Sequence, residues 1–332
     1  MGYGADELYT RMAMLSLPLW QELFEESRQP LFHGTGVLWM GRPGDLRSEA
    51  TRDTLQRVGV PIELLSAAEI TRRYPQLHLN DVDTFGILEP RSGALLARRA
   101  VAAVVEHAAG HGATYLTGEV QPPSGGGLLS SVRLTTGEEI VAAVFVFACG
   151  AWLPKLFPGL LGKRIYPTRQ EVFFFAPPAG DQRYSAPHLP VWIEFIDPRG
   201  PYGFPDIEGR GFKLAFDRHG PAFDPDAGDR LIGAEAVASA RAYLAQRFPA
   251  LSDAPLNESR VCQYENTSSG DFLIDRHPDF SNVWLAGGGS GHGFKHGPAV
   301  GEYVAASILD GSVPEPRFSL ATKREIQCRT VY

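Results

Sequence analysis

Several features that would assign this sequence of 332 residues to a class of protein are missing from it. Its three cysteines, Cys149, Cys262 and Cys328, are odd in number and far apart, so neither a disulfide framework nor a cysteine-based zinc site is indicated. It has no run of basic residues, and its formal net charge of −7 argues against a surface for nucleic acid. No apolar stretch approaches the ~18–20 residues that a membrane span requires.

The first residues also lack the basic start and apolar core of a signal peptide, and they do not form a myristoylation motif. We therefore expect a cytoplasmic protein in a reducing environment, with no membrane partner. The composition that remains, 44% hydrophobic and 21% charged residues, is ordinary for a globular chain. The length is enough for two lobes, because single cores usually stop growing near ~250–300 residues.

The N-terminal third predicts helices and strands in alternation. A strand is expected over 34–41 and a short helix over 67–74, which Ser66 would cap and Pro75 would end. Another helix is expected over 97–109. Before these, Asp6 to Glu26 has the period of an amphipathic helix, with one apolar face formed by Leu8, Met12, Leu15, Leu19 and Leu23.

Strands are expected next over 114–120 and 129–135. The continuous apolar run of 141–148 is typical of a strand buried on both faces, as in a parallel sheet. From 166 to 264 the chain has many short β-like segments between proline and glycine turns, with one helix near 234–247, which is the pattern of an antiparallel sheet. The chain then ends in a strand, a glycine-rich loop and a helix with Pro298 in its first turn.

This order predicts an α/β fold combined with an antiparallel β domain. One discontinuous α/β domain for a cofactor would comprise 1–31, 94–165 and 270–332. A second domain built on the antiparallel sheet, comprising 32–93 and 166–269, would be inserted into it and hold the substrate.

The glycine-rich loop near the C-terminus is the clearest candidate site. Its five glycines let the backbone approach a ligand closely, and the helix after it offers free N–H groups and the positive end of its dipole. Such an end can stabilise negative charge on a reduced flavin ring. The spacing does not form the G-x-G-x-x-G dinucleotide fingerprint, and a structural tight turn is the alternative reading. The glycines are Gly287, Gly288, Gly289, Gly291 and Gly293.

Three other residues have two readings each, and one pair of histidines has to be considered as metal ligands. Lys295 lies in the loop, where it could bind a carboxylate or simply be exposed. Lys213 lies opposite its phenylalanine neighbours on a strand, either on a solvated face or in a ligand cavity. Cys262 could be a core thiol or a reactive one. His292 and His296 are four residues apart, but no third ligand lies near them in sequence, so we predict no metal site.

Together these residues resemble the C-terminal part of the monomeric sarcosine oxidase family, flavin amine oxidases of the D-amino-acid-oxidase/glycine-oxidase superfamily. The resemblance is carried by RVCQYENTSSGDFLIDRHP (260–278) and NVWLAGGGSGHGFKHGPAVGE (282–302). It extends through nearly the whole chain in the order of the family. The further segments are 35–41, 86–95, 147–152, 202–205 and 211–216.

The resemblance implies roles for single residues. Cys262 matches the cysteine that forms a thioether to the FAD ring, and Lys213 matches the lysine that activates oxygen near flavin N5. Lys295 matches a ligand of the substrate carboxylate, and Tyr264 matches an active-site tyrosine. Further cofactor contacts are implied for Val120, Gly150, Trp152, Gly291, His292, Gly293, Phe294 and Lys295.

The reaction implied is oxidation of an amine or N-alkyl amino acid at its C–N bond. Hydride passes to flavin N5, the imine hydrolyses, and O2 is reduced to hydrogen peroxide. Two alternatives stay open: a flavin-dependent dehydrogenase with another electron acceptor, and a non-catalytic form. The partners expected are a small amine or amino acid as substrate and O2. The protein itself is expected to be a monomer. The identity of the amine is open, since Asp217 stands where the family has a histidine, with His219 close by.

The family pattern begins with a strand, G-x-G-x-x-G and a helix that bind the FAD pyrophosphate. The residues 1–4 of this chain align after that unit and after one arginine of the family's carboxylate clamp. We therefore expect the 332-residue form to bind FAD weakly or not at all.

Overall fold

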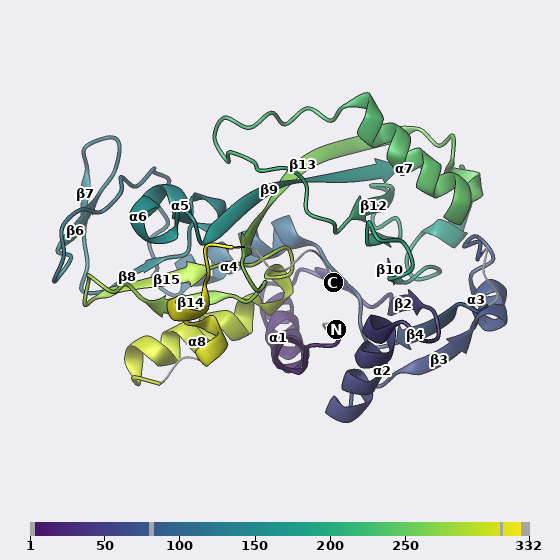
Figure 1. The fold of residues 1–332 in the computed structure, drawn as a ribbon, viewed down its shortest axis with the longest axis horizontal. Helices are drawn as coiled ribbons and strands as arrows, with labels where there is room; N and C mark the ends of the chain where they lie inside the picture. Colours follow the sequence, from purple (N-terminus) through teal and green to yellow (C-terminus); the bar gives the residue numbers. More distant parts are fainter. Residues whose placement is uncertain (1–3, 80–82, 313–314, 327–332) are drawn as a thin grey trace.

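The computed structural model describes residues 4–79, 83–312 and 315–326, so that Cys328 and the first three residues lie outside the described part. Two sheets organise the molecule (Figure 1). The larger contains β2 (Val37–Gly41), β3 (Glu63–Ser66), β4 (Phe85–Glu89), β9 (Ile165–Phe175), β10 (Val191–Glu194), β11 (Pro201–Phe204), β12 (Phe212–Phe216) and β13 (Leu256–Thr267). The smaller contains β8 (Phe145–Phe147), β14 (Leu273–Arg276) and β15 (Val283–Gly287).

Two short ribbons and several helices complete the described fold. The ribbons pair β1 (Phe32–His33) with β5 (Ala94–Leu95) and β6 (Ser131–Arg133) with β7 (Glu139–Val141). The α-helices are α1 (Glu7–Glu26), α2 (Leu46–Val58), α3 (Ala67–Arg73), α4 (Ala97–Gly110), α5 (Leu153–Leu156), α6 (Pro158–Leu161), α7 (Ala234–Arg247) and α8 (Gly297–Leu309). The 3-10 turns η1 (Gly150–Trp152) and η4 (Phe294–His296) lie next to the candidate site.

The large sheet has the strand order β13-β9-β12-β11-β10-β2-β4-β3. Its pairs are antiparallel except for β10 and β2, which run parallel. Helix α7 covers one face, and Trp192 stacks there between Tyr243 and Phe212, with ring centroids 5.7 and 6.2 Å away. This buried aromatic layer fixes the helix to the sheet.

Strands β9 and β13 are the longest pair, and Figure 1 shows them running from the small sheet across to α7. Cys262 lies opposite Gln170 and Tyr264 opposite Thr168 in this pair. The strand β13 ends at Thr267, directly before the loop that leads into the small sheet. The pair therefore carries residues of the large sheet to the edge of the small one.

The small sheet has the order β14-β15-β8, with β15 parallel to β8 and antiparallel to β14. Its buried residues Phe147, Leu273 and Leu285 pack with those of α5 and α6 in one apolar cluster. On the other side α1 and α8 lie together, and Tyr9 and Ala299 share a second cluster. The glycine-rich loop connects β15 to η4 and α8 at the end of this sheet.

Most predicted elements are confirmed, among them the antiparallel character of the middle of the chain. Helix α3 has Ser66 as its N-cap in a capping box with Glu69, and α7 spans the residues expected. Helix α1 is confirmed with Asp6 as its cap, but its face is rotated from the one predicted: Leu15 is 63% exposed, while Trp20 is buried. Small residues on the buried side explain the difference, because Ala13 and Ser16 were not counted as apolar positions.

Two expected strands are wrong. Residues 114–120 form no strand apart from one bridge of Val120 to Leu134. The run 141–148 is not one doubly buried strand: β7 ends at Val141 and β8 covers only 145–147. Val146 is 43% exposed, because β8 is packed on one face only. A continuous apolar run in the sequence cannot show whether a strand will be buried on both faces or on one.

No helix within the described ranges is long and apolar enough to cross a membrane. The division into an FAD-binding and a substrate domain stays our interpretation of this architecture.

Gly203 in β11 generates a stability prediction. A Cβ at this position would lie 2.3 Å from the carbonyl oxygen of Lys213 and 2.5 Å from the Trp192 ring. We expect Gly203→Ala to lower the free energy of unfolding by about 1–3 kcal/mol, because the rigid indole and the backbone cannot give way. Thermal unfolding monitored by circular dichroism measures the effect.

Gly301 provides the matched control, since a Cβ there meets no atom within 4 Å and the residue is exposed in α8. Gly301→Ala should raise the free energy of unfolding by about 0.5–1 kcal/mol, as expected for an open helix position. Equal effects of the two substitutions would contradict the packing assigned to Gly203.

Candidate functional site

Lys213 lies in β12 with its ammonium group over aromatic rings. Its Nζ is 4.3 Å from the ring centroid of Phe204 and 5.7 Å from that of Tyr202. Burial lowers the pKa of Lys213 to about 8, an effect that Cys262 on β13 partly opposes. The ligand-cavity reading of Lys213 is therefore favoured over a solvated face.

Tyr264 on β13 hydrogen-bonds to an acid near this lysine's aromatic neighbour Tyr202. Its hydroxyl donates to Asp217 Oδ1 at 3.3 Å and lies 3.4 Å from the hydroxyl of Tyr202. Burial raises the pKa of Tyr264 well above its ordinary value, so the phenol stays protonated at neutral pH. The hydroxyls of Tyr202 and Tyr264 and the carboxylate of Asp217 form a short polar chain between β11, β13 and the end of β12.

Lys295 lies in η4, immediately after the glycine-rich loop. Trp20 Nε1 of α1 donates to its backbone oxygen at 3.1 Å, which fixes the position of the residue. Burial lowers the pKa of Lys295 to about 8, while the negative charges of Glu89 and Asp217 favour its protonated form. The exposed-loop reading of Lys295 is therefore not supported, since the side chain is half-buried.

At Gly291 the glycine-rich loop packs on β13 so closely that a side chain is excluded. A Cβ at Gly291 would lie 2.6 Å from the Tyr264 ring, and Gly291 has a φ of +83°, which L side chains rarely adopt. The N–H of Gly289 donates to Glu265 Oε1 at 3.1 Å. The loop thus brings backbone N–H groups and the start of α8 to the edge of the polar chain.

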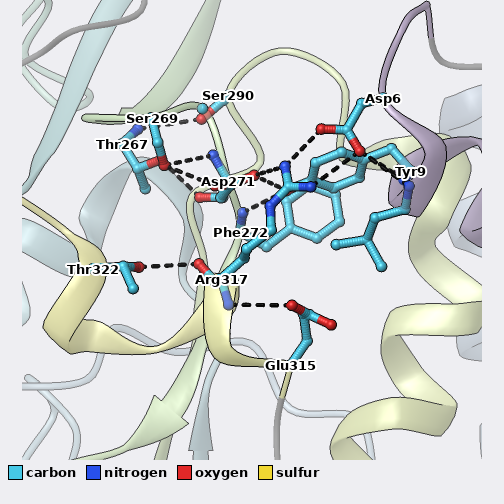
Figure 2. A network of polar contacts seen from close by, with 12 residues as sticks. Asp6, Tyr9, Thr267, Ser269, Asp271, Phe272, Ser290, Glu315, Arg317 and Thr322 are labelled. Carbon is cyan, nitrogen blue, oxygen red and sulfur yellow. Dashed lines mark hydrogen bonds and ion pairs between the residues drawn. The ribbon is translucent and has the colours of Figure 1, made fainter.

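A half-buried network of polar contacts lies behind the loop (Figure 2). Arg317 pairs with Asp6 at 2.6 Å and with Asp271 at 2.5 Å, and the Tyr9 hydroxyl donates to Asp271 at 3.1 Å. Ser290 within the loop donates to Gly288 and accepts from the N–H of Thr267. The N-terminus of α1, the C-terminal segment and the loop are therefore held together.

Three further residues predicted to contact the cofactor lie in or directly after the glycine-rich loop. His292 is buried, with Nε2 3.0 Å from the Gly270 oxygen and its ring stacked on Phe272, so only its backbone faces the loop. Phe294 stacks on Trp20. Gly293 has its Cα beside Gly289.

Gly150 and Trp152 lie in η1, where Trp152 is 41% exposed and donates from Nε1 to Asp226. Gly150 faces Glu265, whose Oε2 would lie 3.9 Å from a Cβ there. Val120 lies apart, against the apolar cluster that Cys149 also borders. Cys262 is exposed on β13, so the core-thiol reading does not apply.

Sequence reasoning missed two acids near the site. Glu89 is 1% exposed and accepts from Trp39 and Ser92, and its charge acts on Lys295. Glu265 follows Tyr264 and lies against the glycine-rich loop. A carboxylate inside an otherwise strand-like segment was the available signal in both cases.

Comparison of the sequence with known proteins identifies its family. The sequence matches the profile of the FAD dependent oxidoreductase (DAO) family over residues 1–307. It is 32% identical over 321 residues to the monomeric sarcosine oxidase of Bacillus sp. (strain B-0618), covering 93% of this chain and 80% of that one. It is 27% identical over 341 residues to the N-methyl-L-tryptophan oxidase of Yersinia pestis (strain Pestoides F), covering 97% and 86%.

The crystal structure of L-proline dehydrogenase from P. horikoshii has the same fold, with a TM-score of 0.80 and 23% identity over 95% of this chain and 83% of that one. The site fits the FAD of the family, because Gly289, Gly291 and Gly293 leave the backbone of the loop partly exposed beside Tyr264 and before α8. This chain belongs to the FAD dependent oxidoreductase (DAO) family.

Proposed function

We propose that this protein oxidises the C–N bond of a small amine or N-alkyl amino acid and passes the electrons to O2. The observation that carries the proposal is the grouping of Lys213 and Lys295, both with a pKa lowered to about 8, around the polar chain of Tyr202, Tyr264 and Asp217. Bound FAD supplies the hydride acceptor. Residues of the glycine-rich loop and Cys262 are proposed to hold it, the latter covalently.

Lys295 is proposed to bind the carboxylate of the substrate. Its ammonium is half-buried, so an anion beside it is weakly screened by water. Its backbone is fixed by Trp20, which keeps the charge in one place. An acid group held there sets the distance of the reacting carbon from the rest of the site.

Tyr202 and Tyr264 are proposed to orient the amine. The Tyr264 proton is directed to Asp217, which leaves phenolic oxygen lone pairs available to accept an N–H bond from the substrate. A neutral amine is required because a protonated nitrogen has no lone pair to assist departure of a hydride. Asp217 lies one residue from the end of β12 and can favour proton loss through Tyr264.

Lys213 is proposed to stabilise negative charge as O2 is reduced. Its ammonium group lies over two aromatic rings, away from bulk water, and its cationic form is retained below pH 8. The alternative is a dehydrogenase with another acceptor, as the name of one protein with this fold, the L-proline dehydrogenase from P. horikoshii, suggests. The oxidase and the dehydrogenase would both act on a small-molecule substrate. We further propose that the chain acts as a monomer, as the name of the Bacillus relative suggests.

The function is tested by adding excess FAD to the purified chain, recording the visible flavin spectrum and measuring peroxide with sarcosine, N-methyl-L-tryptophan and L-proline. Flavin that survives denaturation in the unsubstituted protein, together with only extractable flavin in Cys262→Ser, would support a covalent bond to Cys262. Absence of peroxide with every amine, with reduction of an artificial acceptor instead, would favour the dehydrogenase.

Lys213→Met separates the two halves of the reaction. We expect anaerobic reduction of the flavin by amine to persist, while reoxidation by O2 slows by about 10²–10³-fold, because one preorganised charge is lost. Stopped-flow absorbance follows each half separately. Lys163→Met is the control, since Lys163 is 79% exposed and has Glu325 as its ion-pair partner at 4.0 Å. Unchanged reoxidation in Lys213→Met would contradict the role.

The titration of Lys295 predicts that the affinity of the site for a carboxylate depends on pH. Its pKa is lowered to about 8, so it is cationic below that pH and neutral above it. The affinity of the flavin-loaded enzyme for acetate, read from the perturbed flavin spectrum, should be constant below pH 8 and fall as the pH rises through 8. Lys295→Arg should remove the decline, because guanidinium stays charged.

Lys213→Met should keep the decline, which distinguishes the two lysines that titrate in the same range. Below pH 8 a Lys295→Met variant should bind acetate about 10-fold or more weakly than the parent, the cost of one charge-assisted hydrogen bond, and the difference should shrink above pH 8. Acetate affinity that is insensitive to Lys295→Met would contradict the carboxylate site.

A further inference from the structure

Ser290 lies in the glycine-rich loop with a backbone conformation that L residues rarely adopt. Its φ is +45°, and among the residues described only Arg28 and Glu208 also combine a positive φ with a side chain. Glycines precede and follow it, Gly289 and Gly291, and a glycine at 290 would adopt the same conformation without strain. A serine here costs free energy, so contacts of its side chain have to offset the cost.

The hydroxyl of Ser290 provides such contacts, because it joins the loop to the end of β13 (Figure 2). Its Oγ accepts from the N–H of Thr267 at 3.2 Å and donates to the oxygen of Gly288 at 3.0 Å. The N–H of Ser290 donates to the oxygen of Glu265 at 3.2 Å. The residue is only 1% exposed, so water does not compete for these bonds. Ser290 is therefore bonded through both its backbone and its side chain to the strand that carries Tyr264.

The residues that follow Ser290 lead directly to the groups of the proposed reaction. A Cβ at Gly291 would lie 2.6 Å from the Tyr264 ring, so the loop touches the phenol immediately after Ser290. The chain then enters η4, which contains Lys295. The backbone oxygen of Lys295 accepts from the Trp20 indole at 3.1 Å. The segment is therefore fixed at one end by Ser290 and at the other by Trp20.

We propose that Ser290 is a positioning residue for the reaction, which holds the loop on β13 and thereby keeps Lys295 in place to bind a carboxylate; this rests on the proposed function. A glycine at 290 would relieve the strain, but it would lose the hydroxyl and leave the buried N–H of Thr267 unpaired. Stability and positioning therefore change separately at this residue.

Ser290→Gly and Ser290→Ala separate the two effects. Both remove the hydroxyl, but only alanine keeps a Cβ at the positive φ. We expect Ser290→Gly to melt within about 4 °C of the parent, and Ser290→Ala to melt about 2–8 °C below Ser290→Gly. In both variants the amides of the loop should exchange hydrogen about 10-fold faster, because a bond to β13 is lost. Mass spectrometry of the chain without FAD measures this exchange.

The second readout is the titration of Lys295 in the flavin-loaded enzyme. Burial is the main cause that lowers its pKa to about 8; Glu89 of β4 and Asp217 after β12 oppose the change, and the charge of Lys295 itself acts on His296 of η4. A loop released from β13 admits water to the ammonium group. The pH at which acetate affinity declines should therefore move above 8 in Ser290→Gly, toward the ordinary 10.5 of a lysine. A residue needed only for folding would leave this pH unchanged.

Arg28→Gly is the matched control. Arg28 also has a positive φ, +54°, but it is exposed after the end of α1. This change should raise the melting temperature by about 1–4 °C and leave both the exchange of the loop and the acetate titration as in the parent.

Loop exchange in Ser290→Gly equal to that of the parent would overturn the assignment of Ser290. Faster exchange with an unchanged acetate titration would also overturn it, because Ser290 would then be a structural residue only. Absence of FAD binding by the parent would contradict the proposed function, and the positioning role with it, whereas the exchange measurement would still decide whether Ser290 holds the loop on β13.

Discussion

The pairing of β9 with β13 is the constraint on which the rest of the site depends. Its register, unbroken from Glu258 to Thr267, places Cys262 opposite Gln170 and Tyr264 opposite Thr168, so that alternate residues of β13 take fixed faces. A slip of one residue would turn the face of every side chain on the strand. Because β13 ends shortly before the small sheet begins, one strand positions the Tyr264 phenol and Glu265 against the glycine-rich loop.

The second requirement is that charges stay buried without being neutralised. Lys213 is held over aromatic rings and Lys295 near the carboxylates of Glu89 and Asp217, and burial lowers the pKa of both to about 8. A lysine in this condition is still cationic at neutral pH but is easily discharged, so it interacts strongly with an anion that reaches it. Glu265 has the converse condition, a carboxyl for which burial favours the neutral form. Such departures from ordinary pairing are typical of ligand sites.

Much of the fold could be predicted from the sequence because local signals agreed with packing. The capping box at Ser66 and the period of α7 were sufficient for their helices. The failure at 141–148 has a physical cause: apolar runs report burial potential, and only the neighbouring strands decide which face is covered. The face of α1 was misjudged for a similar reason, since Ala13 and Ser16 are buried by close helix approach. Lys213, Lys295, Tyr264 and Cys262 were found through resemblance, whereas Glu265 depends on contacts between segments distant in sequence, which no local pattern contains.

The position of Lys295 finally depends on a helix that contributes no reacting group. Helix α1 provides Trp20, whose indole donates to the Lys295 backbone, and Tyr9, whose hydroxyl accepts from the N–H of Phe272. At its first turn Asp6 is joined through Arg317 to Asp271, behind the loop. These contacts fix both ends of the segment between β13 and α8. A loop rich in glycine has high conformational entropy when free, and it can hold Lys295 in one place only if its ends are fixed. The glycines that let a cofactor come close to the backbone would leave the loop flexible. The contacts of α1 therefore hold the loop in one conformation and so define the site.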